Sequence, residues 1–430
     1  MTREMKNSGI PWIGEIPKDW GIDTIGNLYT LRTEKVSDKD YAPLSVTKMG
    51  IVPQLETAAK TDDGDNRKLV RVGDFAINSR SDRRGSCGIS AYDGSVSLIN
   101  LVLTPRGQMY PRFYNWLFHT ELFADEFYKW GHGIVDDLWT TRWQEMKRIS
   151  IVSPSYQEQQ KIAEFLDRKC AEVDEMIALQ GQIIEELKAY KQSVITEAVT
   201  KGLNPAAPMR DSGIEWIGSI PEHWEVHPFK AYYKTTKGLN ITKENLVESG
   251  IPVISYGQIH SKLNTGTSIC DELIRYVPET YLASNPECLS KKFDMFFADT
   301  SEDREGAGNM AFIDTDIPIF AGYHTIIARP REEVKTKYFA YLAKTDAWRT
   351  QIRNSISGVK VFSISQKLIN KAYIIIPTPT EQQAIADYLD EKCADIDSLI
   401  QTKQSKIDSL KEYKKSIIYE YVTGKREVEL

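Results

Sequence analysis

Hydrophobic residues follow a helical repeat in two long segments of the chain. Beyond Pro154 and beyond Pro377 they recur at alternating spacings of four and three, which is typical of a coiled-coil seam. The predicted seam residues are Leu166, Cys170, Val173, Ile177, Ile184, Leu187 and Val194 in the first segment, and Leu389, Cys393, Ile396, Ile400, Ile407, Leu410 and Ile417 in the second. Gln180 and Lys191 interrupt the first seam, and Lys403 and Lys414 interrupt the second at the same positions. The pattern predicts two long helices that pack on each other, with polar residues that help to specify their register.

Each predicted helix begins at a recognisable cap. Ser155-x-x-Glu158 and Thr378-Pro379-x-Glu381 are capping boxes, and Pro379 stands at the first helical position, where its missing N–H is not needed. At 1.5 Å per residue, about 42 helical residues make a rod of roughly 60 Å. The Gly- and Pro-containing stretch 202–208 ends the first helix and predicts a linker.

The remaining stretches, 21–153 and 225–376, mix two kinds of pattern. Strand-like runs occur at 253–256 and 373–376, and amphipathic helical patterns run from Phe113 to Trp130 and from Tyr338 to Ile352. We therefore expect a mixed α/β (α+β) domain in each stretch. The predicted division is 1–153 for the first domain, 154–203 for the first helical spacer, 204–376 for the second domain and 377–430 for the second spacer.

The chain repeats itself. Met5 to Trp20 and Met209 to Trp224 share 10 of 16 residues, and Pro154 to Thr200 and Pro377 to Thr423 share 23 of 47. Between these anchors the similarity fades to short framework matches, such as 73–77 against 293–297. Two tandem copies have kept their ends while their middles changed, which is expected if the ends do a common job and each middle recognises something different.

Charge and cysteine content narrow the class of protein. The net charge of −6 lies entirely in the two helical segments, because 154–203 carry 6 basic and 9 acidic residues, 377–430 carry 8 and 11, and each remaining segment carries 20 and 20. The domains are thus free to hold local basic patches. The sequence has no apolar run of membrane-spanning length and no export signal, so we expect a cytoplasmic protein. Five dispersed cysteines without a C-x-x-C pair indicate reduced thiols rather than a disulfide framework or a zinc ribbon.

The order of these motifs resembles the specificity subunits of type I restriction-modification systems. The resemblance rests on the opener I-x-W-I-G-x-I-P-x-x-W at Ile10 and Ile214, and on helices that open P-x-x-x-E-Q-Q-x-I-A-x-x-L-D and continue L-K-x-Y-K-x-S-x-I. It covers essentially the whole chain. It implies two target recognition domains, each reading one half of a bipartite double-stranded DNA sequence, and two helices that pack antiparallel as a spacer.

The resemblance also implies a division of labour. Two methylation subunits and the restriction subunits would dock on this chain and carry S-adenosylmethionine, ATP and Mg²⁺, so we expect this chain to be a non-catalytic subunit without a cofactor or metal of its own. The sequence agrees with this expectation, because it has no P-loop for ATP. The same features fit a specificity subunit of a type II-like complex. A coiled-coil scaffold with two protein-binding domains and no DNA role is the alternative from another class.

Candidate DNA contacts lie in loops that follow strand-like runs. The loop 78–85 combines arginines with small polar residues, which suits phosphate binding and bidentate contacts to guanine, whereas the corresponding 300–306 is more acidic. Two shorter stretches, 47–48 and 256–260, follow matched strands. The predicted contacts are Thr47, Lys48, Ser79, Arg80, Arg83, Arg84, Lys234, Lys237, Tyr256, Gln258, His260 and Arg304. A solvated surface loop is the alternative for each of them.

Other conspicuous residues have simpler explanations. Trp12, Trp20, Trp216 and Trp224 recur in both copies although the middles differ, so packing explains them better than base stacking. Cys170 and its repeat mate on the second seam are expected to be buried small residues. The six histidines show no spacing that suggests a ligand set.

Overall fold

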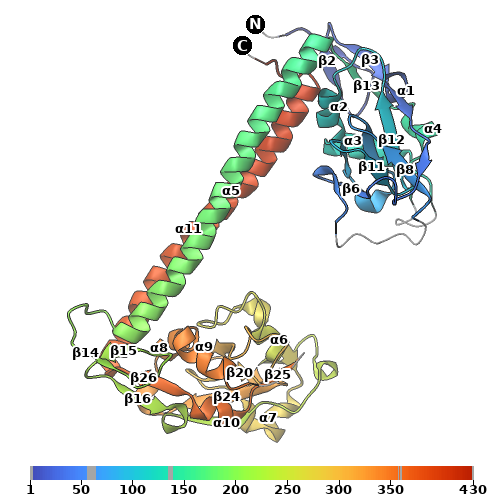
Figure 1. Cartoon of the computed structure of the whole chain (residues 1–430). Coiled ribbons are helices and arrows are strands. Elements are labelled where there is room, and N and C mark those ends of the chain that lie inside the picture. The colour runs from blue at the N-terminus through green and yellow to red at the C-terminus, as the bar shows by residue number, and fades with distance from the viewer. Residues whose placement is uncertain (1–2, 56–63, 134–138, 357, 359–360, 429–430) are drawn as a thin grey trace. The chain divides into compact units, whose positions relative to one another are not determined.

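The computed structural model of the chain describes residues 3–55, 64–133, 139–356, 358 and 361–428 (Figure 1). The chain forms two compact units, Met1–Gly181 with Gln404–Leu430, and Gln182–Lys403. The boundary falls inside both long helices, so each unit contains one mixed domain and a part of each helix. No helix in the described part of the chain combines the length and apolar composition that a membrane span requires.

Unit 1 is built on an antiparallel sheet in the order β10-β9-β12-β4, with a smaller sheet β11-β8-β5 beside it. Its elements are β1 (Met5–Asn7), β2 (Glu15–Pro17), β3 (Gly21–Thr24), α1 (Ile25–Leu28), β4 (Tyr29–Leu31), β5 (Lys35–Val36), β6 (Leu44–Thr47), β7 (Gly50–Pro53), β8 (Arg67–Val70), β9 (Phe75–Asn78), η1 (Ser81–Arg83), β10 (Cys87–Ile89), β11 (Gly94–Val96), β12 (Asn100–Pro105), α2 (Pro111–Phe118), α3 (Glu121–Lys129), α4 (Trp143–Met146) and β13 (Ser150–Ser153), followed by α5 (Tyr156–Lys201). Helices α2 and α3 contribute Phe113, Phe118 and Phe123 to the buried core.

Unit 2 has the equivalent sheet, β17-β24-β20-β22, and a second sheet β19-β18-β23 in which β18 and β23 run parallel. Its elements are β14 (Met209–Asp211), β15 (Ser219–Pro221), β16 (Glu225–Pro228), η3 (Phe229–Ala231), β17 (Tyr233–Lys237), η4 (Lys243–Asn245), β18 (Ile251–Ile254), α6 (Tyr256–Ile259), η5 (Asp271–Leu273), β19 (Arg275–Val277), α7 (Thr280–Ser284), η6 (Pro286–Cys288), β20 (Met295–Ala298), β21 (Thr300–Ser301), β22 (Met310–Phe312), β23 (Phe320–Ala321), β24 (Thr325–Pro330), η7 (Glu332–Val334), α8 (Tyr338–Ala343), α9 (Asp346–Arg353), β25 (Phe362–Ser363), α10 (Gln366–Lys371) and β26 (Tyr373–Ile376), followed by α11 (Pro379–Val422).

The mixed domains confirm the predicted class and the framework alignment. Strands β9 and β20 occupy equivalent central positions, and each is preceded by a buried aspartate that accepts hydrogen bonds from an arginine of a neighbouring strand region. Arg32 binds Asp74 at 2.7 and 2.9 Å, and Arg329 binds Asp294 at 2.9 Å. Burial raises the pKa of Asp294, although the arginine opposes this shift. The shared carboxylate therefore belongs to the framework.

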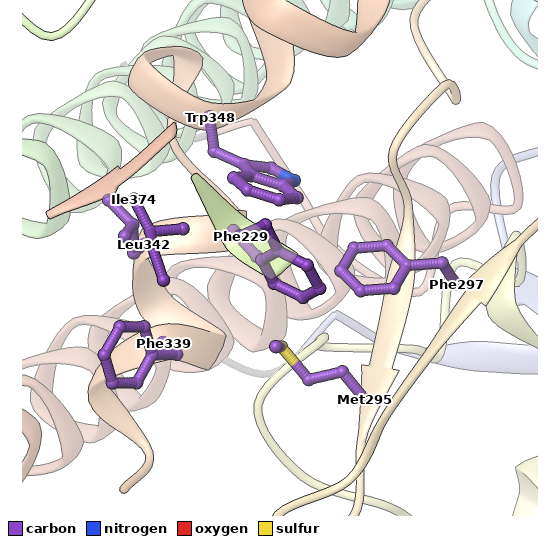
Figure 2. Close-up of a pocket in the computed structure, with 8 residues that line it drawn as sticks. Phe229, Met295, Phe297, Phe339, Leu342, Trp348 and Ile374 are labelled. Carbon is purple, nitrogen blue, oxygen red and sulfur yellow. The ribbon is translucent and has the colours of Figure 1, made fainter. Parts of the chain in front are cut away.

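The apolar core of unit 2 is tightly filled. Figure 2 shows Phe229, Phe297 and Trp348 meeting around a cavity of about 10 Å³. A space of this size holds at most about one water molecule. The packing excludes this cavity as a ligand site.

The two long helices run antiparallel in both units. In unit 1 the rings of Phe165 and Tyr421 are 4.4 Å apart, and Lys414 binds Asp174 at 2.6 Å. In unit 2 Lys191 binds Asp397 at the same distance. All the predicted seam residues are buried or half-buried, which confirms the coiled-coil prediction. Lys191 and Lys414, two of the three lysines that interrupt the seams, are thus each paired with an acidic residue of the opposite helix, in the same register in both units.

Each mixed domain packs on the start of its own helix and on the end of the other helix. The core of unit 1 includes Leu166 from α5 and Val422 from α11, and the core of unit 2 includes Leu389 from α11 and Val199 from α5. The duplicated opener segments contribute to these cores, where Trp20 and Trp224 are both 1% exposed. The predicted packing role is confirmed for these two tryptophans and for the half-buried Trp12, whereas Trp216 is 41% exposed.

One predicted strand is shorter in the structure. The strand expected over 253–256 ends at Ile254, because Ser255 caps the short helix α6 and its N–H donates to the side chain of Gln258 at 3.1 Å. The helical patterns from Phe113 and Tyr338, which predict one or two amphipathic helices, each form two. The breaks follow α2 and α8, and Thr120 caps α3 by accepting a hydrogen bond from the N–H of Phe123 at 3.2 Å.

Candidate nucleic-acid interface

In unit 1 the arginine-rich loop forms the end of the β9–β10 hairpin. Strand β9 is fully buried, and the antiparallel register pairs Ile77 with Cys87. The loop is closed by the N–H of Asn78, which donates to the carbonyl of Ser86 at 2.9 Å, and by the left-handed backbone of Gly85 (φ 75°). The fold therefore presents residues 79–85 as a fixed projection at one end of the sheet.

The arginines of this loop differ in their surroundings. The side chain of Arg83 is 69% exposed, with its Nε 3.4 Å from Asp82. Arg84 is bound to the Asp125 carboxylate, and its guanidinium lies 5.6 Å from the ring centre of Tyr128. The side chain of Arg80 is half-buried, and its backbone forms an isolated antiparallel β-bridge with Thr140. The structure thus leaves Arg83 the most accessible cation of the three.

The structure corrects one predicted contact. Ser79 is 4% exposed, and its hydroxyl donates to the carbonyl of Ile99 at 2.5 Å. A side chain that is committed to the interior cannot reach a base edge, so Ser79 stabilises the loop instead. Its small size and its proximity to the arginines had suggested a contact, but its position directly after a buried strand explains the burial.

A second hairpin brings another predicted patch close to this loop. Strands β6 and β7 are joined at Lys48 and Met49, which are both exposed, and the hydroxyl of Thr47 donates to the carbonyl of Gly50 at 2.9 Å. Gly50 lies against Gly88 of β10 so closely that a Cβ on Gly88 would be 2.7 Å from the Cα of Gly50. Because β10 begins directly after the arginine loop, the hairpin tip and the loop are neighbours.

In unit 2 the two corresponding segments are bound directly to each other. One ring nitrogen of His260, Nε2, lies 2.8 Å from the carbonyl oxygen of Thr300, and the other, Nδ1, lies 3.1 Å from the side-chain amide of Asn309. The structure therefore brings the predicted segments 256–260 and 300–306 together. It also occupies both ring nitrogens of His260, so this side chain positions the loop rather than offering a free donor.

An aromatic cluster beside this loop was not predicted. The ring of Tyr256 lies 5.6 Å from the ring of Tyr323 and 5.4 Å from that of His324. His324 has a left-handed backbone (φ 54°), and its Nδ1 lies 3.1 Å from the carboxylate of Asp299. Tyrosine and histidine side chains can stack on bases or reach their edges. The signal that could have found the cluster is the polar turn Gly322-Tyr323-His324 directly after a buried strand.

The other predicted residues of unit 2 have mixed placements. Gln258 caps α6, and the guanidinium of Arg304 donates to the carbonyl of Arg353 at 3.0 and 3.2 Å. Lys237 is paired with Ile326 at the sheet end that carries the loops, whereas Lys234 is paired with Arg329 toward the opposite end. Both lysines are exposed. The structure brings Lys237 to the loop end and leaves Lys234 apart from it.

These surfaces are suited to binding. Each unit presents loops, short helices and exposed polar side chains at one end of a rigid sheet, which is how proteins usually display recognition residues. Over the residues that the structure describes, no group of three or more His, Cys, Asp or Glu side chains could hold a metal ion. The cysteines at 87, 170, 270, 288 and 393 are all free thiols, and those at 170 and 393 are buried as predicted.

The chain is similar to specificity proteins of type I restriction-modification systems. Residues 221–423 match the family described as the type I restriction modification DNA specificity domain. The type I restriction enzyme MjaVIII specificity subunit of Methanocaldococcus jannaschii is 25% identical over 283 residues, which are 65% of this chain and 62% of that relative.

Two solved structures share the fold. A chain from a study of complex assembly and conformational transition in a type I R-M system has a TM-score of 0.72 at 14% identity, covering 96% of this chain and 99% of that one. The HsdS subunit of Thermoanaerobacter tengcongensis has a TM-score of 0.55 at 15% identity, covering 96% and 98%.

Proposed function

We propose that this chain, a member of the type I restriction-modification specificity subunits, reads a bipartite DNA target with one domain for each half-site. The observation that supports the proposal is that the two domains share the same sheet framework but differ in the loops at the end of the sheet. Equivalent four-stranded sheets carry different side chains, with arginines after β9 in unit 1 and an acidic loop after β20, beside the aromatic cluster of Tyr256, Tyr323 and His324, in unit 2. Two readers of one design with different loops are suited to two different half-sequences.

The long helices would set the gap between the half-sites. Helix α5 has 46 residues and α11 has 44, which correspond to about 69 and 66 Å at 1.5 Å per residue. Readers on one face of B-DNA must be spaced by about 34 Å or a multiple of it. A rigid helix pair in a fixed register is a suitable spacer of that order.

The same helices would dock two methylation subunits. Tyr190 and Tyr413 occupy equivalent repeat positions and are 56% and 43% exposed, and the equivalent Met176 and Leu399 are 40% and 51% exposed. Met176 follows Asp174 by two residues and Tyr413 precedes Lys414 by one, so the register set by that ion pair brings them to the same level. Each unit thus offers an exposed apolar pair, which suits two copies of one partner.

The partner subunits would carry out the methylation and cleavage reactions. Methylation subunits would supply S-adenosylmethionine, and restriction subunits would supply ATP and Mg²⁺, while this chain supplies address and spacing. A type II-like complex with a separate nuclease–methyltransferase would use this chain in the same way. The two assemblies are distinguished by whether cleavage by the reconstituted complex requires ATP.

A domain exchange tests the proposal. Residues 225–376 are replaced by the same domain of a relative with a known target, and methylated adenines are mapped in a host that expresses the complex. We expect one half-site to change while the other half and the gap stay the same. A change in both halves would contradict the modular assignment, and the absence of specific DNA binding by the unmodified complex would favour the protein scaffold.

A further inference from the structure

A polar cavity lies in unit 2 between the end of α5, the α8–α9 junction and the recognition loops. Its volume is about 220 Å³, smaller than the roughly 300 Å³ at which small-molecule sites begin. Ile259 and Asn309 in its wall come from the two segments that His260 joins. The polar residues that line it are Gln192, Ser261, Asn264, Thr265, Asn309, Lys344 and Arg349. A space of this kind fits a single charged group better than a whole ligand.

The cavity is cationic. Lys344 and Arg349 line it, and none of the described lining residues is an aspartate or a glutamate. The ammonium of Lys344 donates to the carbonyl of Thr265 at 2.6 Å, which leaves two of its protons for other acceptors. Arg349 donates to the side-chain oxygen of Asn309 at 2.5 Å and to the carbonyl of Glu305 at 2.6 Å, and its buried Nε has no partner within the described chain. Two fixed cations with spare donors require an acceptor.

The charges around Lys344 support this view. Burial, together with the nearby cations Lys191 and Arg349, lowers the pKa of Lys344 to about 8. Cys393 and Asp397 oppose this shift, and the Asp397 carboxylate is already bound to Lys191 at 2.6 Å. An anion in the cavity would stabilise the charged form of Lys344.

Unit 1 has a cavity at the equivalent place with a different lining. The α2–α3 junction corresponds to the α8–α9 junction, and Lys415 of α11 corresponds to Gln192 of α5. Lys415 is bound to Glu121 at 2.9 Å and to Glu412 at 3.0 Å, and both carboxylates line the cavity. Lys415 of unit 1 is therefore already ion-paired, whereas neither Lys344 nor Arg349 forms a salt bridge with a described residue, although Asp303, Glu305 and Asp346 oppose the lowering of the pKa of Arg349 by burial.

We propose that Lys344 and Arg349 bind a phosphate group of the DNA backbone beside the second recognition loop. The inference rests on the proposed function, since it makes the cavity the anchor that positions the duplex against the segments around His260. Phosphate contacts fix register and orientation, and base contacts carry the sequence information. Because the side chains of the loop 302–305 are mostly acidic, a phosphate contact in unit 2 would have to come from cations outside the loop, and Arg349 lies directly beside it. In unit 1 the exposed side chains of Arg83 and Arg84 would bind the DNA phosphates.

The test replaces Lys344 by Gln in the full chain, assembled with its partner subunits. Affinity for a specific duplex is measured over a range of salt concentrations. Loss of one phosphate contact lowers the slope of log K against log salt by about 0.9 and weakens specific and non-specific binding alike. Lys344→Arg, which keeps the charge, should restore the slope. Lys337→Gln removes an equal charge that is paired with Asp390 at 2.8 Å, and should leave the slope unchanged.

The outcomes separate the cavity from the proposed function. An unchanged slope in a Lys344→Gln variant that melts like the parent protein would overturn the phosphate site while recognition stands. Stabilisation of the parent chain by inorganic phosphate, abolished in Lys344→Gln but without any effect on the DNA slope, would assign the site to free phosphate and overturn the DNA assignment. If the parent complex binds no specific duplex, the proposed function itself fails.

Discussion

Shortening the helix pair by one heptad should shorten the recognised gap. The deletion removes Gln180–Glu186 from α5 and Lys403–Ser409 from α11, which are equivalent positions of the two repeats. It removes the polar seam residues Gln180 and Lys403. It retains the ion pairs of Lys191 with Asp397 and of Lys414 with Asp174. The seam phase is preserved, because a whole heptad is lost from each helix.

The expected change follows from helix and DNA geometry. Seven residues at about 1.5 Å each shorten each helix by about 10 Å, which corresponds to about three base pairs at roughly 3.4 Å per pair. Three base pairs also rotate the groove by about 100°, since B-DNA has about 10.5 pairs per turn. Affinity should therefore fall, and the preferred gap is the informative readout.

The assay selects bound duplexes from a pool in which the half-sites are fixed and the gap length varies. The parent complex should select one gap, and the shortened complex a gap about three base pairs shorter. Deletion from α5 alone serves as the control, because it shifts one helix against the other and should prevent folding. A shortened protein that folds, reads both half-sites and selects the parent gap would refute the spacer argument.

Two further predictions concern the helix seam and the thiols. Lys191→Glu places two carboxylates together at a partly exposed pair, so it should lower stability by about 1 kcal/mol and the melting temperature by about 2–4 °C, and the exchange with Asp397→Lys should restore both; a double variant that melts like the single one would contradict a pairing role. In the native chain a thiol reagent should modify the half-buried Cys270 before the four buried cysteines, and Cys270→Ser should remove the fast phase. Burial raises the pKa of Cys170 to about 11, so rapid reaction there would show that the helices separate.

Local patterns predicted the helices and their seam well. The heptad spacing identified residues that are buried or half-buried in both units. The capping box at Thr378 is formed, because its N–H donates to the Glu381 carboxylate at 3.2 Å and the N–H of Glu381 donates to its hydroxyl at 3.4 Å. In the first helix the N–H of Glu158 donates to the hydroxyl of Ser155 at 3.3 Å, but the Glu158 carboxylate binds Arg3 at 2.5 Å. Periodicity and capping depend on neighbours in the chain, which is why the sequence reveals them.

The recognition surface was less predictable because it depends on distant contacts. The cluster of Tyr256, Tyr323 and His324 forms only when β18 and β23 pair in parallel, and no spacing in the sequence announces that pairing. Arg304 lies in an acidic loop and was a predicted DNA contact, but in the structure its guanidinium donates a hydrogen bond to the carbonyl oxygen of Arg353. The capping pair Ser255 and Gln258 fits a known helix-start pattern, and reading it would have avoided the strand assigned there.

The way each domain rests on two helix ends has a consequence for chain order. The ammonium of Lys425 donates to the carbonyl of Ile13 at 2.7 Å, so the last residues of the described chain lie beside its first ones, as the stretch 202–208 joins α5 to the second opener. A covalent link between the segments around Ile13 and Lys425, with the chain opened between Gly202 and Pro208, would leave the packing partners within each unit unchanged. The order in which the two repeats follow each other along the chain is therefore not required by these contacts.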